Sequence, residues 1–161
     1  MSPPPFSRMR SGAVEMRLSP QETDVIRPLL DQMLQLIAAE TQPDDLRRLF
    51  PPAYEHDDAA QQEFVHFTRD DLLEAKKQAL KTADATLDKG RLKRGLLSVR
   101  LNDDEQQAWL GALNDLRLFM GTRIGVTEEA YEDPEAIDDP SMRLYLYLGW
   151  LQQHLVDALL G

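Results

Sequence analysis

The sequence predicts a mostly α, α+β domain in which four or five helices pack on a small three-stranded antiparallel sheet, with the C-terminal helix central. Three observations lead to this prediction: long apolar stripes with helical spacing, two alternating apolar segments, and helix-capping residues after each segment. The 161 residues, 42% hydrophobic and 29% charged, suit one globular domain. We expect a disordered arm at residues 1–5 and a single domain over residues 6–161.

The first ordered unit is a predicted β-hairpin. The segments FSRMR and AVEMRL flank a Ser-Gly dipeptide at residues 11–12, which suits a two-residue turn. This turn would pair Met9 with Val14, and Arg8 with Glu15 as opposite charges. Met9 and Val14 would then lie on the apolar face, with Arg8 and Glu15 on the outer face.

A long helix follows the hairpin. Ser19 is its predicted N-cap, with Pro20 at the first helical position and Glu22 at the third, which together form a capping box. Apolar residues recur with helical spacing as far as Ile37. Pro28 is expected to kink this helix.

The middle of the chain contains several prolines before the helical pattern resumes. Residues 44–50 are predicted to form a short helix, and residues 59–67 a further one. Thr68 with Asp71 indicates a cap that starts the next helix, which Gly90 is expected to end. We interpret the following RLKRG as a turn.

A strand-and-cap pattern occurs twice, 83 positions apart. Residues 17–22 correspond to residues 100–105, so that Asn102 and Glu105 repeat the capping box. This is either an internal duplication or the common pattern of a strand that enters a capped helix. Both interpretations place Met16 and Val99 in one antiparallel sheet.

The last helix is predicted to begin at residues 139–140. Apolar residues cover more than half of its circumference, which indicates either a central position or contact with a second copy of the chain. The candidate residues for such a homodimer interface are Leu144, Tyr147, Leu148 and Leu151.

One helical pattern carries polar residues among apolar ones. Asn114 and Arg117 share a face, and with Arg123 they could hold an anion or a peptide terminus, because arginine presents a planar fork to carboxylates. The alternative is a buried polar network that fixes the helix register and is satisfied by Asp115 or a neighbouring carboxylate.

A second candidate is a basic surface at the turn before the third strand and on the outer face of the sheet. Nucleic-acid phosphates could contact it, although no helix has the basic surface of a recognition helix. The alternative is a solvated surface of mixed charge. The residues concerned are Arg8, Arg17, Lys89, Arg91, Lys93, Arg94 and Arg100.

The composition argues against several kinds of chemistry. The chain has no cysteine, hence no disulfide, thiolate zinc site or cysteine nucleophile. The three histidines, His56, His66 and His154, lack metal-site spacing, and the acidic residues 128–139 lack the spacing of an EF-hand. No nucleotide or serine-nucleophile motif occurs, so we expect no metal and no cofactor.

The net charge of −10 disfavours sequence-independent binding to nucleic acid but does not exclude a nucleic-acid partner. No apolar run is long enough to cross a membrane, and the N-terminus shows no hydrophobic signal core. We therefore expect a cytoplasmic protein.

Three segments resemble a known family. AWLGALNDLRLFMGTRIGVTEE, LYLYLGWLQQHL and VEMRLSPQE are similar to an actinobacterial family of unknown function, often encoded beside the Clp protease adaptor and commonly described as transcriptional regulators. The resemblance extends from about residue 6 to residue 160 and implies a transcriptional role. Any relative that senses oxidants through thiols differs from this chain, which has none.

These observations favour a non-enzymatic regulatory protein that acts through contacts with another protein. Its site would be the outer face of the sheet or the groove near Arg117 and Arg123. The alternatives are direct DNA binding through the basic turn and sheet face, and an enzyme or binding protein for a small anionic ligand.

Overall fold

The computed structural model describes residues 3–39, 59–124 and 139–161, and for residues 59–69 the backbone alone. The predicted short helix at residues 44–50 lies outside this part of the chain. The elements in chain order are β1 (Phe6–Arg8), β2 (Val14–Leu18), α1 (Pro20–Ala38), α2 (Ala59–Asp88), β3 (Arg91–Lys93), β4 (Leu96–Leu101), α3 (Asp103–Ile124) and α5 (Pro140–Leu160).

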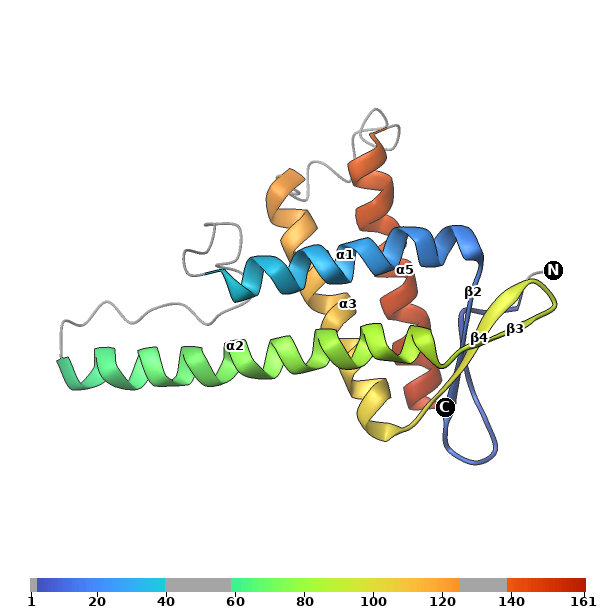
Figure 1. The fold of residues 1–161 in the computed structure, drawn as a ribbon, viewed down its shortest axis with the longest axis horizontal. Helices are drawn as coiled ribbons and strands as arrows, with labels where there is room; N and C mark the ends of the chain where they lie inside the picture. The colour runs from blue at the N-terminus through green and yellow to red at the C-terminus, as the bar shows by residue number, and fades with distance from the viewer. Residues whose placement is uncertain (1–2, 40–58, 125–138) are drawn as a thin grey trace.

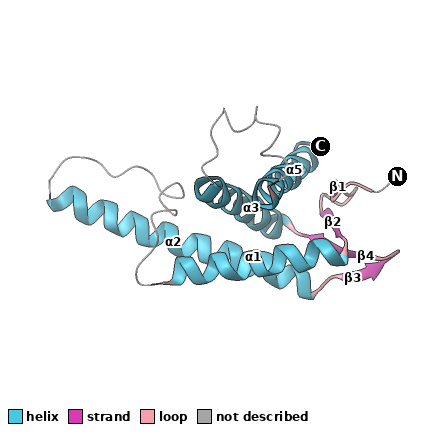
Figure 2. Cartoon of the chain, turned by 90° about the horizontal axis from the view of Figure 1, so that it is seen from above, coloured by secondary structure: helices cyan, strands magenta, loops and turns pink. Residues whose placement is uncertain are grey.

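The described elements follow the order strand, strand, helix, helix twice. Helices α1 and α2 lie antiparallel to each other, and α3 and α5 form a second antiparallel pair that crosses the first (Figures 1 and 2). Helix α3 packs against both α2 and α5. The sheet lies at one end of the helices, where it contacts all four of them.

The sheet has four antiparallel strands in the order β1-β2-β4-β3, one more than predicted. The added strand β3 comes from the RLKRG segment, which we interpreted as a turn. The turn between β3 and β4 consists of only two residues, Arg94 and Gly95. Both have positive φ, at 53° and 81°. Such a two-residue turn matches the twist of a β-hairpin, and it folds β3 back onto β4.

The register of the first hairpin differs from the prediction by one residue. Arg8 pairs with Val14, and Phe6 pairs with Met16. The connection has five residues, 9–13, and it is closed by a hydrogen bond of 2.8 Å from the Met9 N–H to the Ala13 carbonyl. This register buries Phe6, which is 3% exposed, in place of Met9.

The register change moves Arg8 to the helix-facing side of the sheet. There its guanidinium donates a hydrogen bond of 3.0 Å to the carbonyl of Leu159, at the end of α5. A cation at the C-terminal end of a helix is favourable because the last carbonyls carry partial negative charge. Arg8 therefore anchors α5 and does not belong to the predicted basic surface of the outer face.

The N-terminal arm is held against the sheet. The Arg17 N–H donates to the Pro5 carbonyl at 2.7 Å, and the Arg17 guanidinium donates to the Pro4 carbonyl at 3.3 Å. Pro5 is buried. The backbone bond to Pro5 extends the pairing of β1 with β2, and the Arg17 side chain holds Pro4 beside it.

Both predicted capping boxes are present. At α1, Ser19 and Glu22 exchange hydrogen bonds of 3.0 and 3.1 Å. At α3, Asn102 and Glu105 exchange two hydrogen bonds of 2.9 Å each. Each box satisfies two backbone N–H groups that a helix N-terminus otherwise leaves without partners.

Helix α2 departs from the prediction because it is one helix of 30 residues, with no break at Thr68. It ends before Gly90 as expected. A Cβ atom added at Gly90 would lie 2.7 Å from Leu97 Cδ1 and 2.8 Å from Val99 Cγ2, so the chain needs glycine at this crossing. Helix α1 continues across Pro28.

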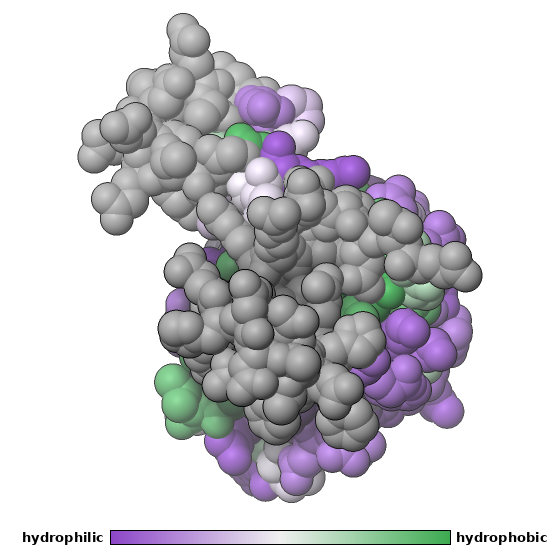
Figure 3. Space-filling model, turned by 90° about the vertical axis from the view of Figure 1, so that its left-hand side faces the viewer, coloured by the Kyte–Doolittle hydropathy of each residue, from purple (hydrophilic) through white to green (hydrophobic). Residues whose placement is uncertain are grey.

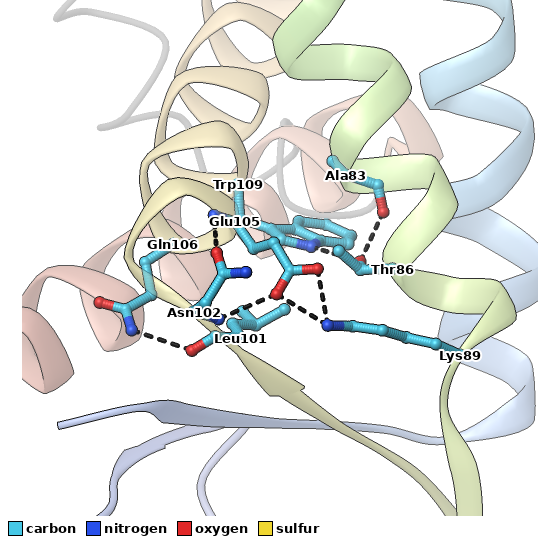
Figure 4. A network of polar contacts seen from close by, with 8 residues as sticks. All are labelled: Ala83, Thr86, Lys89, Leu101, Asn102, Glu105, Gln106 and Trp109. Carbon is cyan, nitrogen blue, oxygen red and sulfur yellow. Dashed lines mark hydrogen bonds and ion pairs between the residues drawn. The ribbon is translucent and has the colours of Figure 1, made fainter. Parts of the chain in front are cut away.

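The core lies between the helices and the helix-facing side of the sheet. A polar cluster beside it connects α2 to the start of α3 (Figure 4). The buried Trp109 indole donates to Thr86 Oγ1 at 2.8 Å, and that hydroxyl donates to the Ala83 carbonyl at 2.6 Å. The largest fully buried side chains are Trp109, Met16, Leu18, Ile26, Leu30, Met33, Ile37, Leu80, Leu101, Leu113 and Leu116.

Candidate functional site

The candidate site is the face of the sheet that points away from the helices. Alternate residues of each strand lie on this face, because successive side chains of a strand point to opposite sides. Glu15 lies opposite Arg100, while Ser98 lies between Arg17 on one side and Arg91 on the other. Basic side chains from three strands therefore meet on one surface.

Glu15 is the carboxylate at the centre of this surface. Its Oε1 accepts a hydrogen bond of 2.8 Å from the Ser98 hydroxyl and lies 3.3 Å from Arg17 Nε. Arg17 also donates to the Ser7 hydroxyl at 2.6 Å. Glu15 and Arg17 are thus paired with each other and form the fixed part of the site.

Four other cations of this surface form no ion pair with any residue that the structure describes: Arg91, Lys93, Arg94 and Arg100. All four are exposed. Lys89 differs, because it pairs with Glu105 at 2.6 Å (Figure 4). We call the surface formed by Arg17, Lys89, Arg91, Lys93, Arg94 and Arg100 around Glu15 and Ser98 the basic face.

Two adjoining hollows lie on the basic face. The first has a volume of about 360 Å³ and is lined by four of the cations, with Glu15, Ser98 and Met9. The second, of about 780 Å³, lies between the N-terminal prolines Pro3 and Pro4 and the β3–β4 hairpin. Glu15, Lys93 and Ser98 line both, so the two hollows form one continuous basic depression.

The charge of the chain is strongly divided. Residues 1–18 and 89–102 together contain eight lysines and arginines and one acidic residue, whereas the remaining residues contain ten basic and 27 acidic ones. The overall charge of −10 therefore combines a positive sheet region with a negative remainder of the chain. At the end of the molecule away from the sheet, the coloured surface is largely hydrophilic, with separate hydrophobic areas (Figure 3).

The other predicted site residues, on α3, do not form a shared pocket in the described structure. The Asn114 side chain accepts a hydrogen bond of 3.2 Å from Gln152 of α5. Arg117 extends past Gly149 of α5, and its buried Nε has no hydrogen-bond partner among the described residues. Arg123 lies over the Phe119 ring, with 5.0 Å between its guanidinium carbon and the ring centroid.

Asp115 pairs with Lys76 of α2 and not with either arginine. Both Asp115 carboxylate oxygens accept hydrogen bonds from Lys76 Nζ, at 2.9 and 3.1 Å. Burial raises the pKa of Asp115, and the lysine offsets part of that effect. The structural alternative predicted that Asp115 would satisfy the polar residues of α3; Asp115 instead pairs with Lys76 and joins α2 to α3.

The residues predicted for a dimer interface divide into two groups. Leu148 and Leu151 are 0% and 1% exposed in the core of the single chain, so they offer no surface to a second copy. Leu144 and Tyr147 pack beside them, partly buried. The Tyr147 hydroxyl donates to the Glu22 carboxylate, and burial together with this carboxylate raises the pKa of Tyr147.

The sequence matches a family defined as a domain of unknown function, DUF2017, over residues 1–159. The chain belongs to the DUF2017 family. No curated protein and no solved structure matches it. The DUF2017 family is itself one of unknown function.

Some sequence features lie outside what the structure describes, including His56, the His66 side chain and residues 128–138 of the acidic segment. Among the described residues of this DUF2017 chain, no group of three histidine or acidic side chains could hold a metal ion. No described helix is long and apolar enough to cross a membrane.

Sequence reasoning missed two features of the basic face: the pairing of Glu15 with Arg100 and the contribution of Pro3 and Pro4 to its wall. The alternation of residues 14–18 assigned Glu15 to the outer face, but its partner depends on the register. Arg100 comes opposite Glu15 only through the pairing of β2 with β4, which joins residues 85 positions apart.

Proposed function

We propose that this DUF2017 protein is a non-enzymatic regulatory protein that acts by binding another protein, and that its basic face holds an acidic segment of that partner. One observation carries the proposal: four exposed cations without ion pairs to described residues gather on one face of a chain whose net charge is −10. A partner with complementary charge would be attracted and oriented by this face.

Two features favour a protein segment over nucleic acid. The four described helices contain 14 acidic and eight basic residues, and their net negative charge would repel a long duplex that reached beyond the basic face. No aromatic residue lines either hollow, so the face lacks the stacking platform that single-stranded nucleic acid uses. A short acidic peptide needs neither the length nor the stacking.

A transcriptional role is the finer form of this proposal. Its support is the resemblance of the sequence to a family commonly described as transcriptional regulators. Direct DNA binding is the second candidate, and Arg94 at the tip of the projecting β3–β4 hairpin favours it (Figure 1). A two-stranded β-ribbon with basic residues can enter a DNA groove.

Affinity capture with crosslinking from a lysate of the native host tests the proposal. The bait is compared with an outer-face variant, Arg91→Gln/Lys93→Gln/Arg100→Gln. A charge-matched control variant, Lys77→Gln/Lys81→Gln/Arg143→Gln, removes three charges from the helices. We expect a specific protein that the wild type and the control variant capture and the outer-face variant does not, including after nuclease treatment.

Three results would contradict this assignment. Equal capture by all three baits would show that the partner does not bind the basic face. Capture that nuclease abolishes, together with tighter binding of promoter fragments than of an equally acidic control protein, would support the DNA alternative. Small anionic metabolites could raise the melting temperature of the wild type but not that of the outer-face variant. This result would assign the hollows to a small ligand.

A further inference from the structure

The basic face ends at an open strand edge. Strand β3 is the last strand of the sheet and pairs only with β4 among the described strands. All three of its residues are exposed, and the Leu92 side chain is 72% exposed. An exposed strand edge can accept one more strand from a partner, with main-chain hydrogen bonds supplying affinity and side chains supplying specificity.

The hairpin geometry identifies which backbone groups face this edge. Because the turn at Arg94–Gly95 has two residues, Lys93 and Leu96 form the hydrogen-bonded pair beside it. The next pair, Leu92 with Leu97, is then a non-hydrogen-bonded pair. The N–H and C=O of Leu92 therefore point away from β4, toward the open edge.

The side chains of β3 define the sequence pattern that would fit there. Arg91 and Lys93 lie on the basic face, and neither forms an ion pair with a described residue. Leu92 lies on the opposite side with Leu97. An added strand would place acidic side chains beside Arg91 and Lys93 and an apolar side chain beside Leu92.

A second copy of the chain fits this edge poorly. Antiparallel pairing of two β3 strands about Leu92 would place Arg91 of one copy opposite Lys93 of the other. Like charges directly opposite each other destabilise a sheet. The charges of the edge therefore favour a partner that is itself acidic.

We propose that β3 binds an extended peptide, in which acidic residues alternate with apolar ones, as a fifth strand of the sheet. This inference rests on the proposed function and specifies how the partner is held. The acidic residues of the peptide lie over the basic face, next to Arg91 and Lys93. Its backbone pairs with the N–H and C=O of Leu92.

The test is a binding titration with a short synthetic peptide that alternates glutamate and valine, against the full chain. The comparison peptide has the same composition with its glutamates in one block. Leu92→Pro removes the outward N–H while leaving the hydrogen bonds of β3 to β4, because Leu92 contributes none of them. Leu92→Thr is the matched control, since it keeps the N–H and suits a strand.

We expect the wild type and Leu92→Thr to bind the alternating peptide, and Leu92→Pro to bind about tenfold more weakly. The block peptide should bind more weakly than the alternating one. In the complex with wild type, hydrogen exchange of the Leu92 amide should slow. Equal affinity of all three proteins, or no added protection at Leu92, would overturn the inference.

The two proposals fail differently. If Leu92→Pro captures the native partner as well as wild type while the outer-face variant does not, strand addition is wrong and the proposed function stands. If the outer-face variant also captures it normally, the proposed function is wrong. Duplex DNA binding to wild type and Leu92→Pro alike, without peptide binding, would assign the face to nucleic acid and overturn the inference.

Discussion

Met16 of β2 lies directly opposite Val99 of β4, and these two residues are also equivalent positions of the sequence pattern that repeats after 83 residues. The strand order β1-β2-β4-β3 is symmetric about this pair. Each central strand leads into a helix with a capping box. The order strand-strand-helix-helix thus occurs twice, and the pairing of β2 with β4 is symmetric about Met16 and Val99. The helices do not share this symmetry, because α2 packs against α3 more extensively than α5 packs against α1.

The two caps should contribute equally to stability. We expect Ser19→Ala and Asn102→Ala each to lower the free energy of unfolding by about 1 kcal/mol, because each leaves an N-terminal N–H of its helix without a side-chain acceptor. The double variant should lose about 2 kcal/mol, since the caps start different helices. Urea denaturation measures all three, and a neutral Asn102→Ala would refute the equivalence of the caps.

The hydrogen bond between Trp109 and Thr86 should stabilise the junction of α2 and α3. Thr86→Val keeps the shape of the side chain and removes the acceptor of the indole N–H, which is buried. We expect a loss of about 1–3 kcal/mol in the free energy of unfolding. The control is Thr82→Val, one turn earlier on the same helix, with an effect within about 0.5 kcal/mol. Equal effects of the two variants would show that the hydrogen bond adds nothing.

Asp115 should make stability depend on pH. Its pKa is raised above the ordinary 3.8, so the native state holds a proton over a pH range in which the unfolded state has released it. The contribution of this group to the free energy of unfolding therefore falls as the pH rises through that range and is constant above it. The measurement is urea denaturation of wild type and Asp115→Asn from pH 3 to pH 7.

The difference between those two proteins isolates the group, because asparagine does not titrate. We expect the stability of wild type relative to Asp115→Asn to decrease from acidic pH toward neutral pH. An increase over the same range would mean that the ion pair with Lys76 outweighs burial and that the pKa is lowered.

A substitution in the turn of the β3–β4 hairpin should stabilise the protein. Arg94 has a φ of 53°, a left-handed conformation that asparagine adopts more readily than arginine. We expect Arg94→Asn to raise the free energy of unfolding by about 0.5 kcal/mol. Gly95→Ala, at a φ of 81°, should lower it by about 1 kcal/mol. A stabilising Gly95→Ala would contradict the assigned turn.

Local sequence patterns predicted much of the fold. The cap residues Ser19 and Asn102 and the alternation around Met16 and Val99 are short-range signals, and they were confirmed because nothing distant overrides them. The added strand β3 had no such signal. Its residues Arg-Leu-Lys are mostly charged and it is only three residues long, so its pairing with β4 depends on the turn that follows.

The candidate site was predictable in part. Basic residues on the outer face follow from strand alternation, and six of the seven predicted ones line the hollows. Arg8 was wrong because a five-residue connection, not a two-residue turn, fixes the register of the first hairpin. Which cations lack ion pairs depends on contacts between distant residues, such as Lys89 with Glu105, and a single sequence does not show these.

The measurement that tests the central claim most directly is site-specific photocrosslinking in living cells. A benzophenone amino acid replaces Lys93 on the basic face, and in a second strain it replaces the exposed Lys81 of α2. We predict a discrete protein adduct at position 93 that is absent at position 81 and is lost when Arg91→Gln and Arg100→Gln are added. The same adducts at both positions, or a nucleic-acid adduct alone at position 93, would contradict the proposal that the basic face binds an acidic protein segment.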